Sequence, residues 1–85
     1  MIHNLELTLE QRPEVLERVL RVTRHRGFTV RDMHMTLAED QRLQLAMAVD
    51  SDRAIELLSR QLTKLVDVAR CTVRPASSLS RTVNG

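Results

Sequence analysis

Apolar and polar residues alternate along this chain with two different periods, and the changes of period divide it into six elements. Leu5, Leu7 and Leu9 alternate with polar neighbours, which predicts a half-buried strand over residues 2–9. Residues 43–49 repeat this alternation with fewer exceptions than any other part of the chain. We therefore expect a second strand there, with one buried and one solvated face.

Two other segments place apolar residues three and four positions apart, which is the period of a helix. The first begins at Pro13, a residue suited to the first helical position, and ends before Gly27, which suits a left-handed stop. Acid-before-base spacings of four residues predict ion pairs along it, Glu14 with Arg18 and Glu17 with Arg21. The second helix covers residues 52–65, with Ser51 or Asp52 as its N-cap.

The remaining segments complete the order of elements. Residues 28–37 predict a strand whose apolar phase changes, which indicates a bulge near Arg31. Residues 66–74 are rich in β-branched side chains and predict a last strand, closed by Pro75. We expect residues 76–85, rich in Ser, to form a disordered C-terminal tail.

The predicted order is strand, helix, strand, strand, helix, strand. With right-handed crossovers this gives an α+β ferredoxin-like βαββαβ sandwich, a four-stranded antiparallel sheet with both helices on one face. The opposite face is then bare. If that face carries apolar side chains, it is expected to dock another copy or another protein.

Length and composition restrict the chain to one domain, which we assign to residues 1–75 of 85. Only 1% of the residues are aromatic, so Leu, Val, Ile and Met must build the core, and we expect Met33, Met35 and Met47 to pack there. A chain this short buries only about 60% of its unfolded surface, so association would add stability. We expect a partner.

The charge balance argues against several classes of partner. The net charge is only +2 and acidic residues are distributed among the basic ones, so the charge does not indicate a nucleic-acid partner. The predicted central strands also lack the aromatic side chains on which RNA bases stack. Neither a targeting signal nor a transmembrane segment is recognisable, so we expect a cytoplasmic protein that does not bind membranes.

No catalytic or metal-binding constellation is recognisable in the sequence. His3, His25 and His34 lie on different predicted elements, and Cys71 has no second cysteine. The glycine-rich loops that hold phosphate groups are missing as well. The basic residues Arg18, Arg21, Arg24 and Arg26 are candidates for a partner contact; a solvated helix face laced with Glu is the alternative interpretation.

Three stretches resemble a known family. Residues 16–20, residues 24–28 (Arg-His-Arg-Gly-Phe) and residues 61–68 (Gln-Leu-Thr-Lys-Leu-Val-Asp-Val) are similar to the small regulatory subunit of acetolactate synthase, also called acetohydroxyacid synthase. The resemblance covers about residues 1–74 and is to the short bacterial form that accompanies isoenzyme II. Such subunits are built on the ACT domain, a ferredoxin-like fold.

The resemblance implies a non-catalytic chain that binds and activates the large catalytic subunit of this bacterial enzyme of valine, leucine and isoleucine synthesis. It implies that thiamine diphosphate, magnesium and FAD belong to the large subunit, with no cofactor on this chain. In many members the small subunit also confers feedback inhibition by valine. ACT domains typically pair, so the resemblance implies a homodimer. The effector sites of such pairs lie between the first loop of one copy and the second strand of the other.

Carried over, the effector site corresponds to a remnant, Gln11, Arg12, Pro13, Glu14, Thr29 and Val30. Valine-responsive members have Asn at the position of Gln11 and Gly at the position of Glu14. A glutamate there adds bulk and a negative charge that would face the carboxylate of the ligand, so we expect valine binding to be weak or absent. An ordinary strand-to-helix turn is the alternative interpretation of these residues.

Two functions from other classes stay open at this point. The chain could be a free-standing ACT-type amino-acid sensor, in which case an amino acid should raise its melting temperature. A small enzyme acting on acyl or phosphate groups is less compatible with the sequence, because the glycine-rich anion loop of such enzymes is missing.

Overall fold

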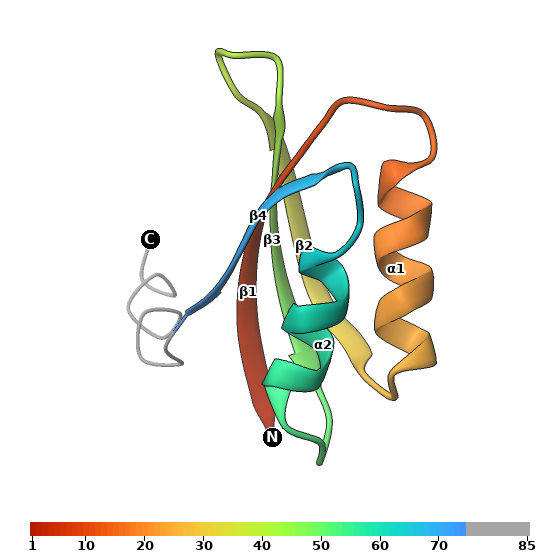
Figure 1. The fold of residues 1–85 in the computed structure, drawn as a ribbon. Coiled ribbons are helices and arrows are strands. Elements are labelled where there is room, and N and C mark those ends of the chain that lie inside the picture. The colour runs from red at the N-terminus through yellow and green to blue at the C-terminus, as the bar shows by residue number, and fades with distance from the viewer. Residues whose placement is uncertain (75–85) are drawn as a thin grey trace, which may run out of the picture.

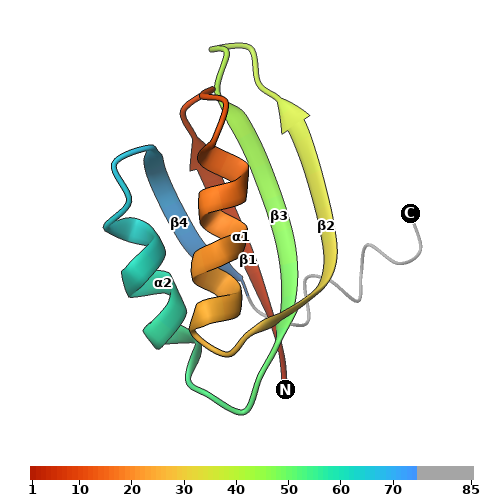
Figure 2. The same cartoon turned by 90° about the vertical axis from the view of Figure 1, so that its right-hand side faces the viewer.

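The computed structural model describes residues 1–74, so the predicted tail at 76–85 lies outside the described residues. The elements are β1 (Ile2–Leu9), α1 (Val15–His25), β2 (Thr29–Leu37), β3 (Leu43–Asp50), α2 (Ile55–Thr63) and β4 (Val68–Arg74). Four strands pair antiparallel in the order β2-β3-β1-β4. Figures 1 and 2 show both helices on one face of this sheet, which confirms the predicted βαββαβ sandwich.

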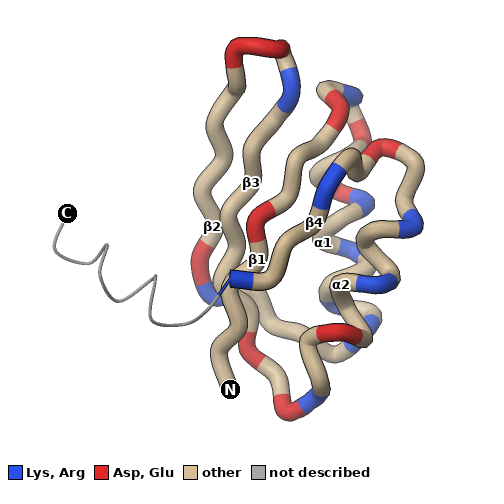
Figure 3. The backbone as a smooth tube through the Cα atoms, turned by 60° about the vertical axis from the view of Figure 1, so that its left-hand side comes forward, with Lys and Arg blue, Asp and Glu red and all other residues tan. Residues whose placement is uncertain are grey.

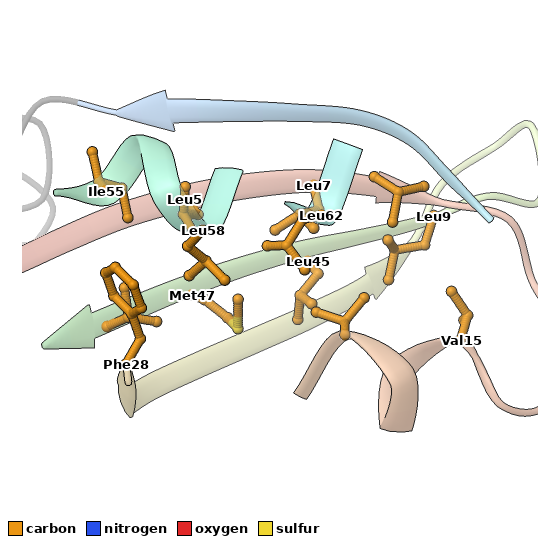
Figure 4. Packing of buried hydrophobic residues seen from close by; sticks show 13 residues of the cluster. Leu5, Leu7, Leu9, Val15, Phe28, Leu45, Met47, Ile55, Leu58 and Leu62 are labelled. Atoms are coloured by element: carbon orange, nitrogen blue, oxygen red, sulfur yellow. The ribbon is translucent and has the colours of Figure 1, made fainter. Parts of the chain in front are cut away.

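The core lies between the sheet and the two helices (Figure 4). The register pairs Leu5 with Met47 and Leu7 with Leu45, so the alternating apolar residues of β1 and β3 share the helix side. Each such side chain contributes about 1.5–3 kcal/mol when it is fully buried. The other buried hydrophobic side chains of this cluster are Leu9, Val15, Val19, Phe28, Val49, Ile55, Leu58, Leu62 and Val68.

Helix α1 begins later than the sequence predicts. Its N-cap is Glu14 and its first residue is Val15, while Pro13 lies in a turn closed by the Val15 amide donating to the Arg12 carbonyl at 3.3 Å. Pro13 thus takes the second position of a turn, which its fixed φ also favours. The helix ends as predicted, since Gly27 has φ +86°.

The second helix is shorter than predicted at both ends. Ala54 is its N-cap, without a capping side chain. The predicted cap residue Ser51 instead accepts a hydrogen bond from the Arg53 amide at 3.0 Å, which makes a local turn before the helix. Strand β4 likewise begins at Val68 and not Val66, because the Val68 amide donates to the Leu65 carbonyl at 3.1 Å and closes a turn there.

The bulge predicted near Arg31 is present, since the register between β2 and β3 shifts between Val30 and Asp32. The shift puts Met33 and Met35 on the helix side, opposite Met47 and Leu45. The prediction that both methionines pack in the core is wrong, because they are 38% and 44% exposed whereas Met47 is 2% exposed. Strand β2 is an edge strand beyond the cover of the helices, as Figure 2 shows.

The face opposite the helices is polar and not apolar. Asn4, Glu6 and Thr8 alternate with the buried leucines of β1, and Gln44 and Ala46 do the same in β3. A shallow hollow of about 160 Å³ lies on this face, lined in part by Glu6, Gln44 and Ala46. Most of the exposed large apolar side chains of the sheet lie along the β2 edge (Met33, Met35 and Leu37); the others are Val73 on β4 and Ile2 at the start of β1.

Candidate functional site

The loop between β1 and α1 contains four of the predicted site residues, Gln11, Arg12, Pro13 and Glu14, and all four are exposed. It is held at its start by a backbone hydrogen bond in which the Glu10 amide donates to the Asp67 carbonyl at 2.8 Å. We call these residues, Gln11–Glu14, the first loop.

The carboxylate of Asp67 adds a second restraint on the first loop. It forms ion pairs with Arg12, at 3.5 Å from Nε, and with Arg18, at 3.2 Å from Nη1. Asp67 is only 13% exposed, so these contacts are partly shielded from solvent. Asp67 belongs to the Lys-Leu-Val-Asp-Val stretch, and no local pattern links it to Arg12, which lies far away in the sequence.

A further ion pair ties the β2–β3 hairpin to the same end of the molecule. Arg42 Nη2 lies 3.2 Å from Glu10 Oε2. Glu10 therefore connects the hairpin, through its side chain, to the turn containing Asp67, through its backbone amide. The first loop is thus braced by contacts at Glu10 and Arg12, while the side chains of its four residues remain exposed.

The other two predicted site residues, Thr29 and Val30, lie elsewhere. They line an open groove of about 560 Å³ between α1 and β2, which we call the α1–β2 groove, together with Leu20, Arg24, Gly27, Phe28 and Met33. Within one chain the first loop and the start of β2, which contains Thr29 and Val30, lie at opposite ends of α1 (Figure 1). The 11 residues of α1 separate them by roughly 16 Å at about 1.5 Å per residue.

The four arginines predicted as partner contacts differ in their surroundings. Arg18 donates to Asp67, whereas Arg21, Arg24 and Arg26 are exposed and form no ion pair within residues 1–74. The predicted pairs of Glu14 with Arg18 and Glu17 with Arg21 are not formed. Arg18 instead pairs with the less solvated carboxylate of Asp67, and the described chain thus leaves Arg21, Arg24 and Arg26 exposed and unpaired. Figure 3 shows basic positions along α1.

Other reactive groups do not assemble into a second site. No group of three or more His, Cys, Asp or Glu side chains suited to a metal ion occurs within residues 1–74. Burial raises the pKa of the Cys71 thiol to about 11, so this thiol stays protonated at neutral pH. In the same part of the chain, neither helix has the length and hydropathy that a membrane crossing requires.

The fold and this arrangement of loop and groove define a class of protein. Residues 11–71 match the family model of the ACT domain. A solved structure described as the small subunit of acetolactate synthase from Thermotoga maritima superposes with a TM-score of 0.76 at 25% identity, over 86% of this chain and 47% of that one. An ACT domain protein from Streptococcus pneumoniae, at 13% identity, shares the fold with a TM-score of 0.74.

Relatives found by sequence indicate which family of ACT domain proteins the chain belongs to. The chain is 43% identical over 84 residues to the acetolactate synthase isozyme 2 small subunit of Escherichia coli, covering 98% of this chain and 97% of that one. It is 31% identical to a probable acetolactate synthase small subunit of Methanothermobacter thermautotrophicus, of which it spans about half the length. The chain therefore belongs to the family of acetolactate synthase small subunits, with an ACT domain matched over residues 11–71, as the resemblance predicted.

Proposed function

We propose that this chain binds the large catalytic subunit of acetolactate synthase and raises its activity. The observation that carries the proposal is the 43% identity to the Escherichia coli isozyme 2 small subunit over nearly the full length of both chains. The chain is a small, non-catalytic subunit. The thiamine diphosphate, magnesium and FAD of the reaction belong, in this proposal, to the large subunit, in the cytoplasm of a bacterium.

A chain without catalytic groups raises a rate by binding one state of its partner more tightly than another. If the large subunit adopts its active arrangement only part of the time, selective binding to that arrangement increases its population. Each tenfold preference corresponds to about 1.4 kcal/mol of differential binding free energy. Activation should therefore saturate with the concentration of the small subunit.

Arg21 and Arg26 are the proposed contacts with the large subunit. Both are exposed, and neither has an acidic partner within residues 1–74. Arg18 is a weaker candidate, because Asp67 already accepts a hydrogen bond from its guanidinium group at 3.2 Å. Arginine suits such a contact because its planar guanidinium group can donate two hydrogen bonds to one carboxylate.

We further propose that valine binds weakly or not at all. Glu14 is the N-cap of α1 and forms no ion pair within the described residues, so its negative charge lies unneutralised beside the helix start. An effector carboxylate held by the amides of that helix end would meet this charge. In this proposal, Gln11–Glu14 act as an ordinary strand-to-helix turn and not as an effector site.

Two copies are proposed to pair along β2. This strand is at the edge of the sheet, and its helix side exposes Met33, Met35 and Leu37 to 38%, 44% and 55%. An uncovered edge with exposed apolar side chains is a favourable surface for pairing with another strand. The effector-site residues are divided between the two ends of α1, so only a second copy could bring them together.

The test is acetolactate formation by the large subunit from the same source, measured with increasing amounts of purified chain and then with valine. A saturable rise that valine leaves unchanged supports both proposals. A rise that valine abolishes contradicts the argument from Glu14. If the rate does not rise at any concentration, and an amino acid raises the melting temperature of the chain, the sensor interpretation replaces the regulatory one.

A further inference from the structure

The α1–β2 groove is open along the β2 edge and contains one free charge. Leu20, Phe28, Val30 and Met33 contribute its apolar lining, and Arg24 is an exposed guanidinium without an acidic partner in residues 1–74. A groove of this composition fits an apolar surface that carries a carboxylate.

The chain itself presents such a surface on the same face of α1. Glu17, Leu20 and Arg24 are spaced by three and four residues, so Glu17 and Arg24 are two helical turns apart on one face. Glu17 is exposed and, like Arg24, forms no ion pair among the described residues. Arg21, also exposed, lies at helical spacing from both Glu17 and Arg24. This face of α1 is thus acidic at Glu17, toward its N-terminal end, and basic at Arg21 and Arg24, toward its C-terminal end.

A surface with this polarity is complementary to itself under two-fold symmetry. Antiparallel pairing of two β2 strands keeps all helices on one side of the joined sheets and sets the two α1 helices antiparallel. Met33 is the middle residue of β2 and lines the groove with Leu20, the middle residue of the α1 face. A two-fold axis near Met33 then brings the acidic half of one face toward the basic half of the other.

We propose that a second copy of this chain covers the α1–β2 groove, with Glu17 of each copy paired with Arg24 of the other. The inference rests on the proposed pairing along β2 and adds its register and its charged contact. Each dimer contains two such pairs. Arg24 is then neutralised by a protein carboxylate, and a free amino acid that enters the groove must compete with Glu17.

Charge reversal tests the contact. Glu17→Lys and Arg24→Glu should each weaken self-association by about tenfold or more, because two attractive pairs per dimer become repulsive. The double variant E17K/R24E restores opposite charges and should recover most of the affinity. Sedimentation velocity with interference optics measures this, since the chain contains no Trp or Tyr to absorb light at 280 nm.

Matched controls on α2 are Glu56→Lys and Arg60→Glu, which reverse exposed charges of the same types far from β2. They should leave self-association unchanged, and circular dichroism should report the same helix content for all variants. Equal weakening by the α2 variants, or no recovery in E17K/R24E, overturns the proposed contact. A wild-type chain that stays monomeric at every concentration instead overturns the pairing along β2.

Cysteine substitution tests the register independently. Met33→Cys places a thiol at the axis, where antiparallel Cα atoms lie about 4.5–5.5 Å apart and a disulfide can form under mild oxidation. Met35→Cys, on the same face of the same strand, should cross-link poorly because the two copies of that residue are about four positions apart. Cys71 contributes little background, since its thiol is half-buried and protonated. Preferential cross-linking of Met35→Cys would contradict the register.

Discussion

The carboxylate of Asp67 lies between two arginines that come from the first loop and from α1. Its backbone carbonyl accepts from Glu10 as well, so one residue holds the end of β1, the first loop and the first turns of α1. At the scale of single residues, the shape of the first loop depends on this contact. The contact between the exposed side chains of His34 and Asp32, by contrast, lies within one strand and joins no separate segments.

Replacement of Asp67 by Asn keeps the volume of the side chain and removes its charge. We expect Asp67→Asn to lower the free energy of unfolding by about 1–2 kcal/mol, since two partly shielded ion pairs are lost. Urea denaturation followed by far-UV circular dichroism measures the change. Asp32→Asn is the matched control: it removes one exposed pair with His34 and should cost under about 0.5 kcal/mol. Similar costs for the two variants would contradict the role assigned to Asp67.

Asp50 gives a prediction about pH. The N-terminal ammonium group of Met1, at 3.0 Å, and Arg31, at 3.1 Å, both donate to its carboxylate and hold its pKa below the usual value of 3.8. A lowered pKa in the folded state means that the contribution is complete above about pH 4 and is lost as the pH falls through the folded value. Unfolding of wild type and Asp50→Asn, compared from pH 6 to pH 2.5, should therefore show a stability difference that shrinks only at the acidic end. A difference that is constant over this range would contradict the prediction.

At the scale of elements, the molecule depends on how each helix and strand ends. Gly27 ends α1 with φ +86°, and a Cβ atom there would lie 2.8 Å from Arg53 Nε. This left-handed turn directs the chain back from α1 into β2 and brings Phe28 into the core, where it is 1% exposed. The bulge at the start of β2 then sets which of its faces looks toward the helices.

The left-handed conformation of Gly27 can be tested with two substitutions that both place a Cβ atom against Arg53. Gly27→Ala should destabilise the fold by about 1–2 kcal/mol, because an ordinary side chain is strained at this φ. Gly27→Asn should cost less, since Asn tolerates the left-handed region better. Thermal unfolding ranks the two. If the cost is equal in both variants, contact with Arg53 and not backbone strain is its cause.

At the scale of the whole molecule, an 85-residue chain with one small aliphatic core has a modest reserve of stability. Both the proposed self-association and the proposed binding to a large subunit would add to that reserve through mass action. The division of the effector-site residues between the ends of α1 also belongs to this scale. In a single chain they form a braced loop and a separate groove; in the proposed dimer, two chains would bring them together.

Restoration of the residues found in valine-responsive relatives tests the effector site at this scale. The double variant Gln11→Asn with Glu14→Gly removes the charge beside the start of α1 and opens space for a carboxylate. We expect it to bind valine at least about tenfold more tightly than wild type, a gain of about 1.4 kcal/mol, measured by isothermal titration calorimetry. Glu39→Gly, in the exposed β2–β3 hairpin, is the control. Tight valine binding by the wild-type chain would contradict the argument from Glu14.

Local sequence patterns predicted the six elements, their order and the bulge near Arg31, because each of these features depends on residues close together in the chain. Leu5, Leu7 and Leu9 face one side of a strand whatever else the chain does. The resemblance in residues 16–20, 24–28 and 61–68 was sufficient to indicate the family. The residues of the first loop lie together because they follow one another in the chain, and their role as part of an effector site stays a prediction.

The contacts of the charged residues and of the edge strand depend on tertiary packing and could not be predicted from local patterns. Arg18 pairs with Asp67, 49 positions away, and not with Glu14 at helical spacing, because the distant carboxylate is less solvated. Met33 and Met35 carry the same apolar pattern as Met47, yet they lie on an edge strand that the helices do not reach. Thr29 and Val30 lie in a groove and not beside the first loop, because α1 stands between them. These contacts depend on packing between segments that are distant in the sequence, and a local pattern of residues cannot predict such packing.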